Sequence, residues 1–345
     1  MSPVLRLVGL GLGPPEYMTL KAVKKLEESD IVYLDTYTSP LPSELVEFLR
    51  SRLADRLKLA GRSDLEEKAG ELVEKAETMS VAVAVPGDPL IATTHIALLI
   101  EAAERGVECE VVYGVSSLSA AIGISCLSSY RFGRVVTIPR EAGEESLRTI
   151  YRSVEENIES GLHTLVLLDV SDGGLTASEA VRRLLSVGAA VGGRFGPESL
   201  VIILARLGYA DEVRTACKAA KVESLRLPPP PHIIIIPSQL RSYEREAVGK
   251  LMHVDEELLR PDVSVGMRRS RAERYIAKAS SVFAKLNILS GDAETHRILE
   301  LAQSYLDDAR FFLNSQMVDD TLIAVSYAEG LLDCLRILGR VEFTW

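Results

Sequence analysis

Turns rich in glycine, proline and acidic residues follow short apolar segments in the first part of this sequence. Pro86–Pro89 follows the run Val81–Val85 and contains Asp88, and Gly9–Pro15 follows another apolar run that ends at Val8. Glycine permits a positive φ, whereas proline fixes the chain and removes a hydrogen-bond donor. Turns of this kind leave backbone N–H and C=O groups pointing outward. They therefore predict a small-ligand site built from loops.

The elements that position these turns can be predicted from the apolar pattern. Val81–Val85 shows no polar alternation, which is typical of a strand buried on both faces in a parallel sheet. We expect a helix from about Leu90 to Arg105, with Gly106 as its C-cap. In open α/β sheets, small ligands bind at the carboxyl ends of the strands. The Pro86–Pro89 turn is therefore a candidate binding edge.

The remaining chain divides into three regions. Up to Gly114, strands alternate with helices, which indicates a parallel α/β sheet. Residues 115–247 contain more strands for their length and predict a mixed α+β sheet. Beyond about residue 262, apolar residues recur at three-and-four spacing in three segments, which predicts a bundle of three amphipathic helices. The predicted domains are 1–114, 115–247 and 262–345. Specific predicted elements are strands at Ile31–Leu34, Cys109–Tyr113, Arg134–Ile138, Leu165–Val170, Leu200–Ala205 and His232–Ile236, and helices at Thr19–Glu28, Leu45–Leu53, Leu65–Thr78, Val115–Ser125, Glu145–Ser160 and Ser178–Ser186.

Composition limits the classes of partner. The 345 residues carry a net charge of −10, which argues against nucleic acid as the main partner because phosphate binding requires an excess of Lys and Arg. The four cysteines are far apart and form no Cys-x-x-Cys pair, so we expect neither a zinc site nor disulfides. No apolar run approaches the roughly 20 residues of a membrane span, and the amino terminus lacks signal-peptide features. We expect a cytoplasmic protein without metal, nucleic-acid or membrane partners.

Several motifs, in a fixed order, resemble those of the diphthine synthase family, methyltransferases of the tetrapyrrole-methylase fold that use S-adenosylmethionine. The most specific are Pro-Gly-Asp-Pro-Leu-Ile-Ala-Thr-Thr-His at Pro86–His95 and Gly-Leu-His-Thr-Leu-Val-Leu-Leu-Asp at Gly161–Asp169. Others are Val8–Leu12, Tyr33–Ser39, Tyr130–Gly133, Leu204–Gly208 and Pro230–Ile233. The C-terminal region resembles an uncharacterised family of archaeal helical domains instead. The implied fold is a two-domain α/β methylase with a C-terminal three-helix bundle.

The resemblance implies a function and a set of cofactor-binding residues. It implies methylation of the amino group on the modified histidine of translation elongation factor 2, in diphthamide biosynthesis, by a homodimer. Methyl transfer needs a cleft that orients two reactants and excludes water, and little acid or base from the protein. The positions matching the family's S-adenosylmethionine site are Leu12, Asp88, Ile91, Ser117, Leu118, Leu168, Leu207 and His232.

Five of these positions also have a structural interpretation. Asp88 could bind the ribose or methionine part of the cofactor, or cap the following helix, or do both. Leu12 could simply form a tight turn, and Leu168 and Leu207 could belong to the core. His232 begins a strand after the rigid prolines, where a histidine is usually structural, although its backbone or ring could reach the adenine.

Other functions remain as alternatives. An acid at Asp35 could bind a ribose in a nicotinamide-dependent dehydrogenase, but Pro14 stands where the dinucleotide-binding motif needs glycine. A related methylase acting on a tetrapyrrole or RNA, and a non-catalytic protein of the same fold, also remain. The segment after Gly133 is shorter than in the family and lacks its tryptophan. This difference bears on the identity of the methyl acceptor more than on the identity of the methyl donor. The bundle could enlarge the core, cover a dimer or dock the protein substrate.

Overall fold

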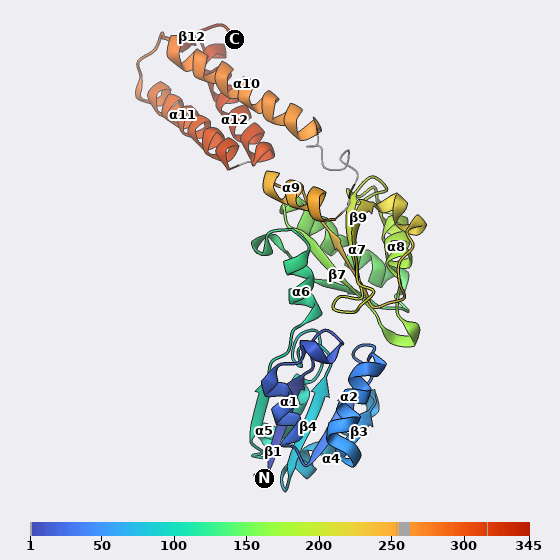
Figure 1. The fold of residues 1–345 in the computed structure, drawn as a ribbon. Coiled ribbons are helices and arrows are strands. Elements are labelled where there is room, and N and C mark those ends of the chain that lie inside the picture. Colours follow the sequence, from blue (N-terminus) through green and yellow to red (C-terminus); the bar gives the residue numbers. More distant parts are fainter. Residues whose placement is uncertain (1, 253, 255–262, 316) are drawn as a thin grey trace. The chain divides into compact units, whose positions relative to one another are not determined.

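The computed structural model describes residues 2–252, 254, 263–315 and 317–345, and these form two compact units, 1–259 and 260–345. The predicted boundary at residue 262 lies outside the described residues, and the boundary at residue 114 stays a prediction. Figure 1 shows the elements along the chain. The first unit contains two five-stranded sheets. Each sheet forms a lobe together with the helices that cover it, and we call these the N-terminal lobe and the C-terminal lobe. The second unit is helical.

The N-terminal lobe is built on a fully parallel sheet, as predicted. Its strand order is β3-β2-β4-β1-β5. Helices α1 and α2 pack on one face, and α4 and α5 pack on the other, so the central strands β1 and β4 are buried on both faces. The bounds are β1 Val4–Gly9, α1 Leu20–Glu27, β2 Ile31–Asp35, α2 Ser43–Leu53, β3 Leu57–Ala60, α3 Arg62–Leu65, α4 Ala69–Ala76, β4 Ser80–Val85, α5 Ile96–Glu104 and β5 Cys109–Val112.

Two predictions for this lobe were wrong. The helix expected from about Leu90 begins only at Ile96, because Ala92 adopts a positive φ of 57° and interrupts the helical path. The helix expected over Leu65–Thr78 is divided into α3 and α4 by a turn at residues 66–68, and it ends at Ala76. Both differences lengthen loops at the carboxyl edge of the sheet. As a result, more side chains than predicted reach that edge.

The C-terminal lobe contains a mixed sheet of order β6-β7-β10-β8-β9, as predicted. Only the β6–β7 pair is parallel, whereas β7–β10, β10–β8 and β8–β9 are antiparallel. Helices α7 and α8 cover one face, and α6 and α9 cover the other. The bounds are α6 Ser117–Ile124, β6 Val136–Ile138, α7 Glu144–Glu159, β7 Thr164–Leu168, α8 Ala177–Val191, β8 Leu200–Ala205, β9 Val213–Lys218, β10 His232–Ile236 and α9 Ser242–Leu251.

The second unit is a three-helix bundle, as predicted. Its helices are α10 Val263–Lys285, α11 Ala293–Asn314 and α12 Val318–Ile337. A core of small and aliphatic side chains, including Ala279, Ala309 and Ala328, allows close helix packing. A short antiparallel pair, β11 Asn287–Ile288 with β12 Val341–Glu342, lies beside it. Across the described ranges, no helix is long and apolar enough to cross a membrane.

Candidate active site

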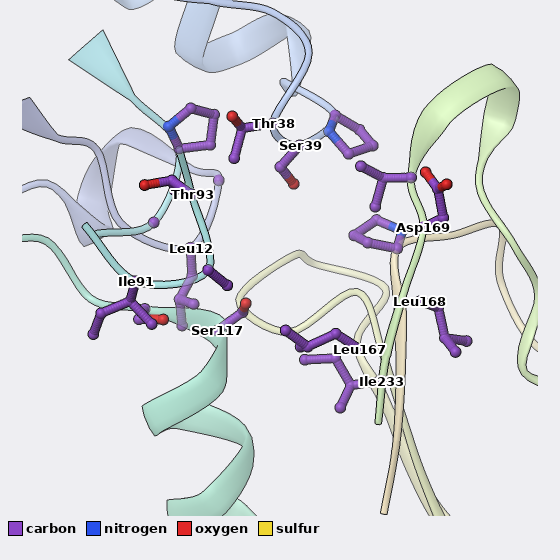
Figure 2. Close-up of a pocket in the computed structure, with 18 of the residues that line it drawn as sticks. Leu12, Thr38, Ser39, Ile91, Thr93, Ser117, Leu167, Leu168, Asp169 and Ile233 are labelled. Atoms are coloured by element: carbon purple, nitrogen blue, oxygen red, sulfur yellow. The ribbon is translucent and has the colours of Figure 1, made fainter. Parts of the chain in front are cut away.

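A cleft of about 740 Å³ is lined by loops of both lobes. This volume falls within the roughly 300–1,000 Å³ typical of small-molecule sites. The N-terminal lobe contributes the segments that follow each of its five strands, β1 to β5, and the C-terminal lobe contributes residues around the ends of β7, β8 and β10. Figure 2 shows Leu12, Ile91 and Ser117 on one side of the cavity, and Leu167 and Ile233 from strands of the C-terminal lobe on another. The carboxyl edge of the parallel sheet is thus one wall of the cleft.

Three glycine loops meet backbone to backbone beneath this wall. Gly11 and Gly87 exchange two hydrogen bonds, with N···O distances of 3.1 and 2.8 Å. A Cβ atom at Gly114 would lie 2.1 Å from the carbonyl oxygen of Gly87, so only glycine allows this approach. Gly11 and Gly87 also adopt positive φ values. Gly11 and Gly87, which lie in the predicted ligand-binding turns, therefore join with Gly114 to hold the loops after β1, β4 and β5 together.

Asp88 fixes the same junction through its side chain. Its Oδ1 accepts a hydrogen bond from the Leu90 N–H at 3.0 Å, and its Oδ2 accepts one from the Gly114 N–H at 3.2 Å. Asp88 is buried yet lines the cleft. It does not cap α5, which begins eight residues later. The capping interpretation was therefore wrong, and a carboxylate with four lone-pair positions retains capacity for a ligand.

The structure brings most of the predicted cofactor residues into one cavity. Seven of them line it, and their binding role stays a prediction: Leu12, Asp88, Ile91, Ser117, Leu168, Leu207 and His232. Leu118 does not line the cavity and packs instead toward the core shared by α6 and β10. Its side chain points away because it follows Ser117 by one residue on a helix.

Both ring nitrogens of His232 are bonded within the protein, so its predicted contact with the adenine would have to come from its backbone or the face of its ring, and it stays a prediction. Its Nδ1 accepts from the Ala177 N–H at 3.1 Å, at the start of α8, and its Nε2 donates to the Pro228 carbonyl at 2.8 Å. Burial lowers the pKa of His232, which keeps the ring neutral in this role. The residue still lines the cleft.

Asp35 is fully buried and bonded within the protein, which removes it as a ribose ligand. It accepts hydrogen bonds from the Tyr37 and Thr38 N–H groups at 2.9 and 3.0 Å, and from the Thr38 hydroxyl. His95 Nε2 lies 3.2 Å from its Oδ2, although off the direction of a good hydrogen bond. Burial raises the pKa of Asp35, but the neighbouring His95 and Thr38 outweigh burial and hold the pKa below its ordinary value. Asp35 thus shapes the Tyr37–Leu41 loop, and the dehydrogenase alternative loses its acidic ligand.

Asp169 is the main acidic group that the C-terminal lobe places in the cleft, and sequence reasoning did not assign it a role. Its Oδ2 accepts from the Arg140 N–H at 3.0 Å, and its Oδ1 accepts from the N–H and hydroxyl of Ser171 at 2.9 and 2.7 Å. Burial raises its pKa, but the backbone N–H groups of Arg140 and Ser171 outweigh burial and lower it, so the carboxylate is ionised. The sequence feature that could have identified Asp169 is its position at the carboxyl end of a buried strand.

Direct contacts join the two lobes beside the cleft. The Tyr209 hydroxyl donates to the Pro40 carbonyl at 3.0 Å. Gly208 has a positive φ, and a Cβ atom there would lie 2.7 Å from the Cβ of Leu12. Because Leu207 precedes these residues, the turn after β8 both lines the cleft and holds its walls in place.

The cleft fits S-adenosylmethionine in size and chemistry. It offers apolar side chains for a flat purine, including Leu12, Leu168 and Ile233, and backbone and carboxylate acceptors near Asp88 for hydroxyl and amino groups. Within the described ranges, no cluster of three or more His, Cys, Asp or Glu residues is arranged to hold a metal ion.

Comparison with known proteins agrees with this architecture. Residues 4–223 match the family model of Tetrapyrrole (Corrin/Porphyrin) Methylases, and residues 271–341 match a protein family of unknown function, DUF357. Diphthine synthase from Methanothermobacter thermautotrophicus is 34% identical over 247 residues, which cover 70% of this chain and 93% of that protein. Diphthine synthase from Methanopyrus kandleri is 37% identical over 258 residues, which cover 72% of this chain and 95% of that protein. A crystal structure of diphthine synthase superposes with a TM-score of 0.67 at 30% identity, covering 75% of this chain and all of that chain.

The fold and the cleft define a tetrapyrrole methylase, a class of S-adenosylmethionine-dependent methyltransferase. Within that class, the chain belongs to the diphthine synthase family, with an additional DUF357 region at its C-terminal end. The predicted family, fold, enzyme class and cofactor are thereby confirmed.

Proposed function

We propose that this enzyme methylates the amino group on the 3-amino-3-carboxypropyl side chain of the modified histidine in translation elongation factor 2. The observation that carries the proposal is the single cleft between loops of both lobes, in a chain that matches diphthine synthases over nearly their full length. The name of those relatives supports a role in diphthamide biosynthesis. We further propose that the enzyme acts in the cytoplasm as a homodimer.

The proposed donor site comprises the seven cleft-lining residues that were predicted to bind S-adenosylmethionine, together with Leu118, which adjoins them in the chain. When bound, S-adenosylmethionine supplies a sulfonium methyl group: the amine lone pair forms the new N–C bond, the S–C bond breaks with its electrons remaining on sulfur, and positive charge passes to nitrogen. Leu12, Leu168 and Leu207 exclude water from the nucleoside, while Asp88 holds the loops that position the donor. The amine must lose its proton before attack, and solvent at the open cleft can accept it.

Incubation of the full chain with methyl-labelled S-adenosylmethionine and the elongation factor tests the proposal. The factor carrying the aminocarboxypropyl histidine should become labelled, and the same factor with an unmodified histidine should not. Labelling of a tetrapyrrole or RNA instead would support a related methylase. Absence of S-adenosylmethionine binding by calorimetry at high micromolar concentration would support a non-catalytic protein.

A further inference from the structure

The acceptor side chain named above carries a carboxylate beside its amine, so a site for it needs one cation and one anion. The cleft contains Arg62 from the N-terminal lobe and Asp169 from the C-terminal lobe. Opposite charges from two different lobes therefore line the same cavity. This arrangement matches a zwitterion better than it matches the neutral adenine of the donor.

Arg62 has unused hydrogen-bonding capacity. Its guanidinium stacks over the Tyr37 ring at 5.2 Å and forms a long ion pair with Glu66, in which Nε lies 3.9 Å from Oε1, beyond hydrogen-bond distance. Among the described residues it donates no hydrogen bond, in contrast to Arg131, which donates four. The stacking orients a planar fork of donors whose geometry suits a carboxylate.

Glu66 is less available than Asp169 as the anion. Its Oε1 already accepts from the hydroxyls of Thr94 and Tyr37 at 2.8 and 3.2 Å, which joins the loops after β2, α3 and β4. Asp169 is held rigidly by Arg140 and Ser171, and three hydrogen bonds leave one of its four lone-pair positions open. The positive charge of Arg62 also contributes to lowering the pKa of Asp169, so the two groups act on each other.

Figure 2 shows the surroundings of this end of the cavity. Thr38 and Ser39 lie on one side and Asp169 on another, with Leu168 next to Asp169. Polar side chains therefore line this part of the cleft together with apolar ones.

We propose that Arg62 and Asp169 form the acceptor-binding end of the cleft, with Arg62 binding the carboxylate and Asp169 facing the amine. This inference rests on the proposed function. Nitrogen is positively charged when the protonated side chain arrives and again after each methyl transfer, so a fixed carboxylate stabilises these cationic stages, and it accepts a hydrogen bond from the neutral amine that attacks. Arg62 holds the chain by its carboxylate while the amine turns between successive transfers.

Arg62→Gln and Asp169→Asn, in the full chain, test the proposal with two acceptors. One is the factor with the free carboxylate, and the other is the same factor with that group converted to a carboxamide. Arg62→Gln should raise the KM for the carboxylate acceptor roughly ten- to hundred-fold, as expected from loss of a charge-assisted hydrogen bond. Wild type should show a similar loss with the carboxamide acceptor, whereas Arg62→Gln should no longer distinguish the two acceptors. Arg62→Lys should recover part of the affinity because it retains the charge.

Asp169→Asn should lower kcat/KM by at least about ten-fold, on the same basis. Donor affinity measured by calorimetry should stay within about two-fold of wild type in both variants, which shows that the cleft is intact. Arg52→Gln, an exposed arginine of α2 paired with Glu27, serves as the matched control and should behave as wild type.

The outcomes separate the two levels of proposal. If wild type labels the factor but Arg62→Gln still prefers the carboxylate acceptor, the acceptor assignment is overturned and the proposed function stands. Values of kcat/KM for Asp169→Asn within two-fold of wild type would likewise overturn it. If wild type does not label the factor, the proposed function fails, and this inference fails with it.

Discussion

Two charged clusters of the first unit use the same residue types in opposite ways. In the C-terminal lobe, Glu244 is fully buried and accepts from Arg131 at 2.5 Å, from His163 at 3.1 Å and from the Ser128 N–H at 3.0 Å. Nearly every donor and acceptor there is paired within the protein. In the cleft, Arg62 is largely exposed and Asp169 retains an open position. The first cluster fixes α9 to the sheet, whereas the second is available to a ligand.

This comparison explains why motif strength alone does not identify a site. Arg131 and His163 belong to motifs that carry the family resemblance, yet their side chains point into a closed network. Burial lowers the pKa of His163, and its Nδ1 accepts from the Ser238 N–H at 3.1 Å, which keeps the ring neutral. Unused hydrogen-bonding capacity beside a cavity is the better indicator of function.

The largest expected effect comes from breaking the closed network. Glu244→Gln should lower the free energy of unfolding by roughly 3–5 kcal/mol, because it leaves the Arg131 charge buried without its anion. Urea denaturation measures this change. Glu246→Gln, in the same helix but exposed and paired with Lys250, should change stability by less than about 0.5 kcal/mol. Equal effects of the two substitutions would show that burial of the network contributes nothing.

The same network should make the protein sensitive to acid. The folded-state pKa of His163 lies below its ordinary value of 6.5 because of burial, so the unfolded chain binds the proton more readily. Its contribution is fully present above pH 6.5 and is lost as the pH falls through the lowered folded-state pKa. Burial raises the pKa of Glu244, but backbone N–H groups and His163 outweigh burial and lower it, which extends the loss below pH 4.5. Urea midpoints measured from pH 8 to pH 4 should fall, and a flat profile would contradict this account.

The sequence predicted the interior of the fold better than its edges. Strands such as β4 and β10 are continuous apolar runs, so burial alone identifies them. The edge strands β3 and β9 were missed because they contain polar residues and are only partly buried, so they show no continuous apolar run. Helix α9 was missed because one of its two buried residues is Glu244, and a buried charge gives no apolar periodicity.

The candidate site could be predicted only in part, for a similar reason. Asp88 and Ile91 lie in a turn whose composition marks it as a binding loop. Arg62 and Asp169 become neighbours of one cavity only when two lobes meet, which no local pattern shows. The structural partners of His232, Ala177 and Pro228, could not be predicted because they come from a helix start and a proline segment that the sequence does not connect to it.

A smaller effect is expected from the junction that positions the donor. Asp88→Ala should weaken S-adenosylmethionine binding roughly ten- to hundred-fold, because the N–H groups of Leu90 and Gly114 lose their acceptor and each unpaired buried group costs about 1–3 kcal/mol. Isothermal titration calorimetry measures the affinity. Asp55→Ala, an exposed acid after α2, is the control and should bind normally. Unchanged affinity in Asp88→Ala would place the donor elsewhere in the cleft.

The smallest expected effect tests the contact between the lobes. Tyr209→Phe removes the hydrogen bond to the Pro40 carbonyl and nothing else, since the ring and its stacking beneath Arg206 at 4.2 Å remain. A single neutral hydrogen bond contributes about 0.5–1.5 kcal/mol, so donor affinity should fall no more than roughly ten-fold. Burial raises the pKa of Tyr209, so the hydroxyl stays protonated and the effect should be the same from pH 7 to pH 9. A loss as large as that of Asp88→Ala would mean that the lobe contact, rather than the glycine junction, controls the shape of the donor site.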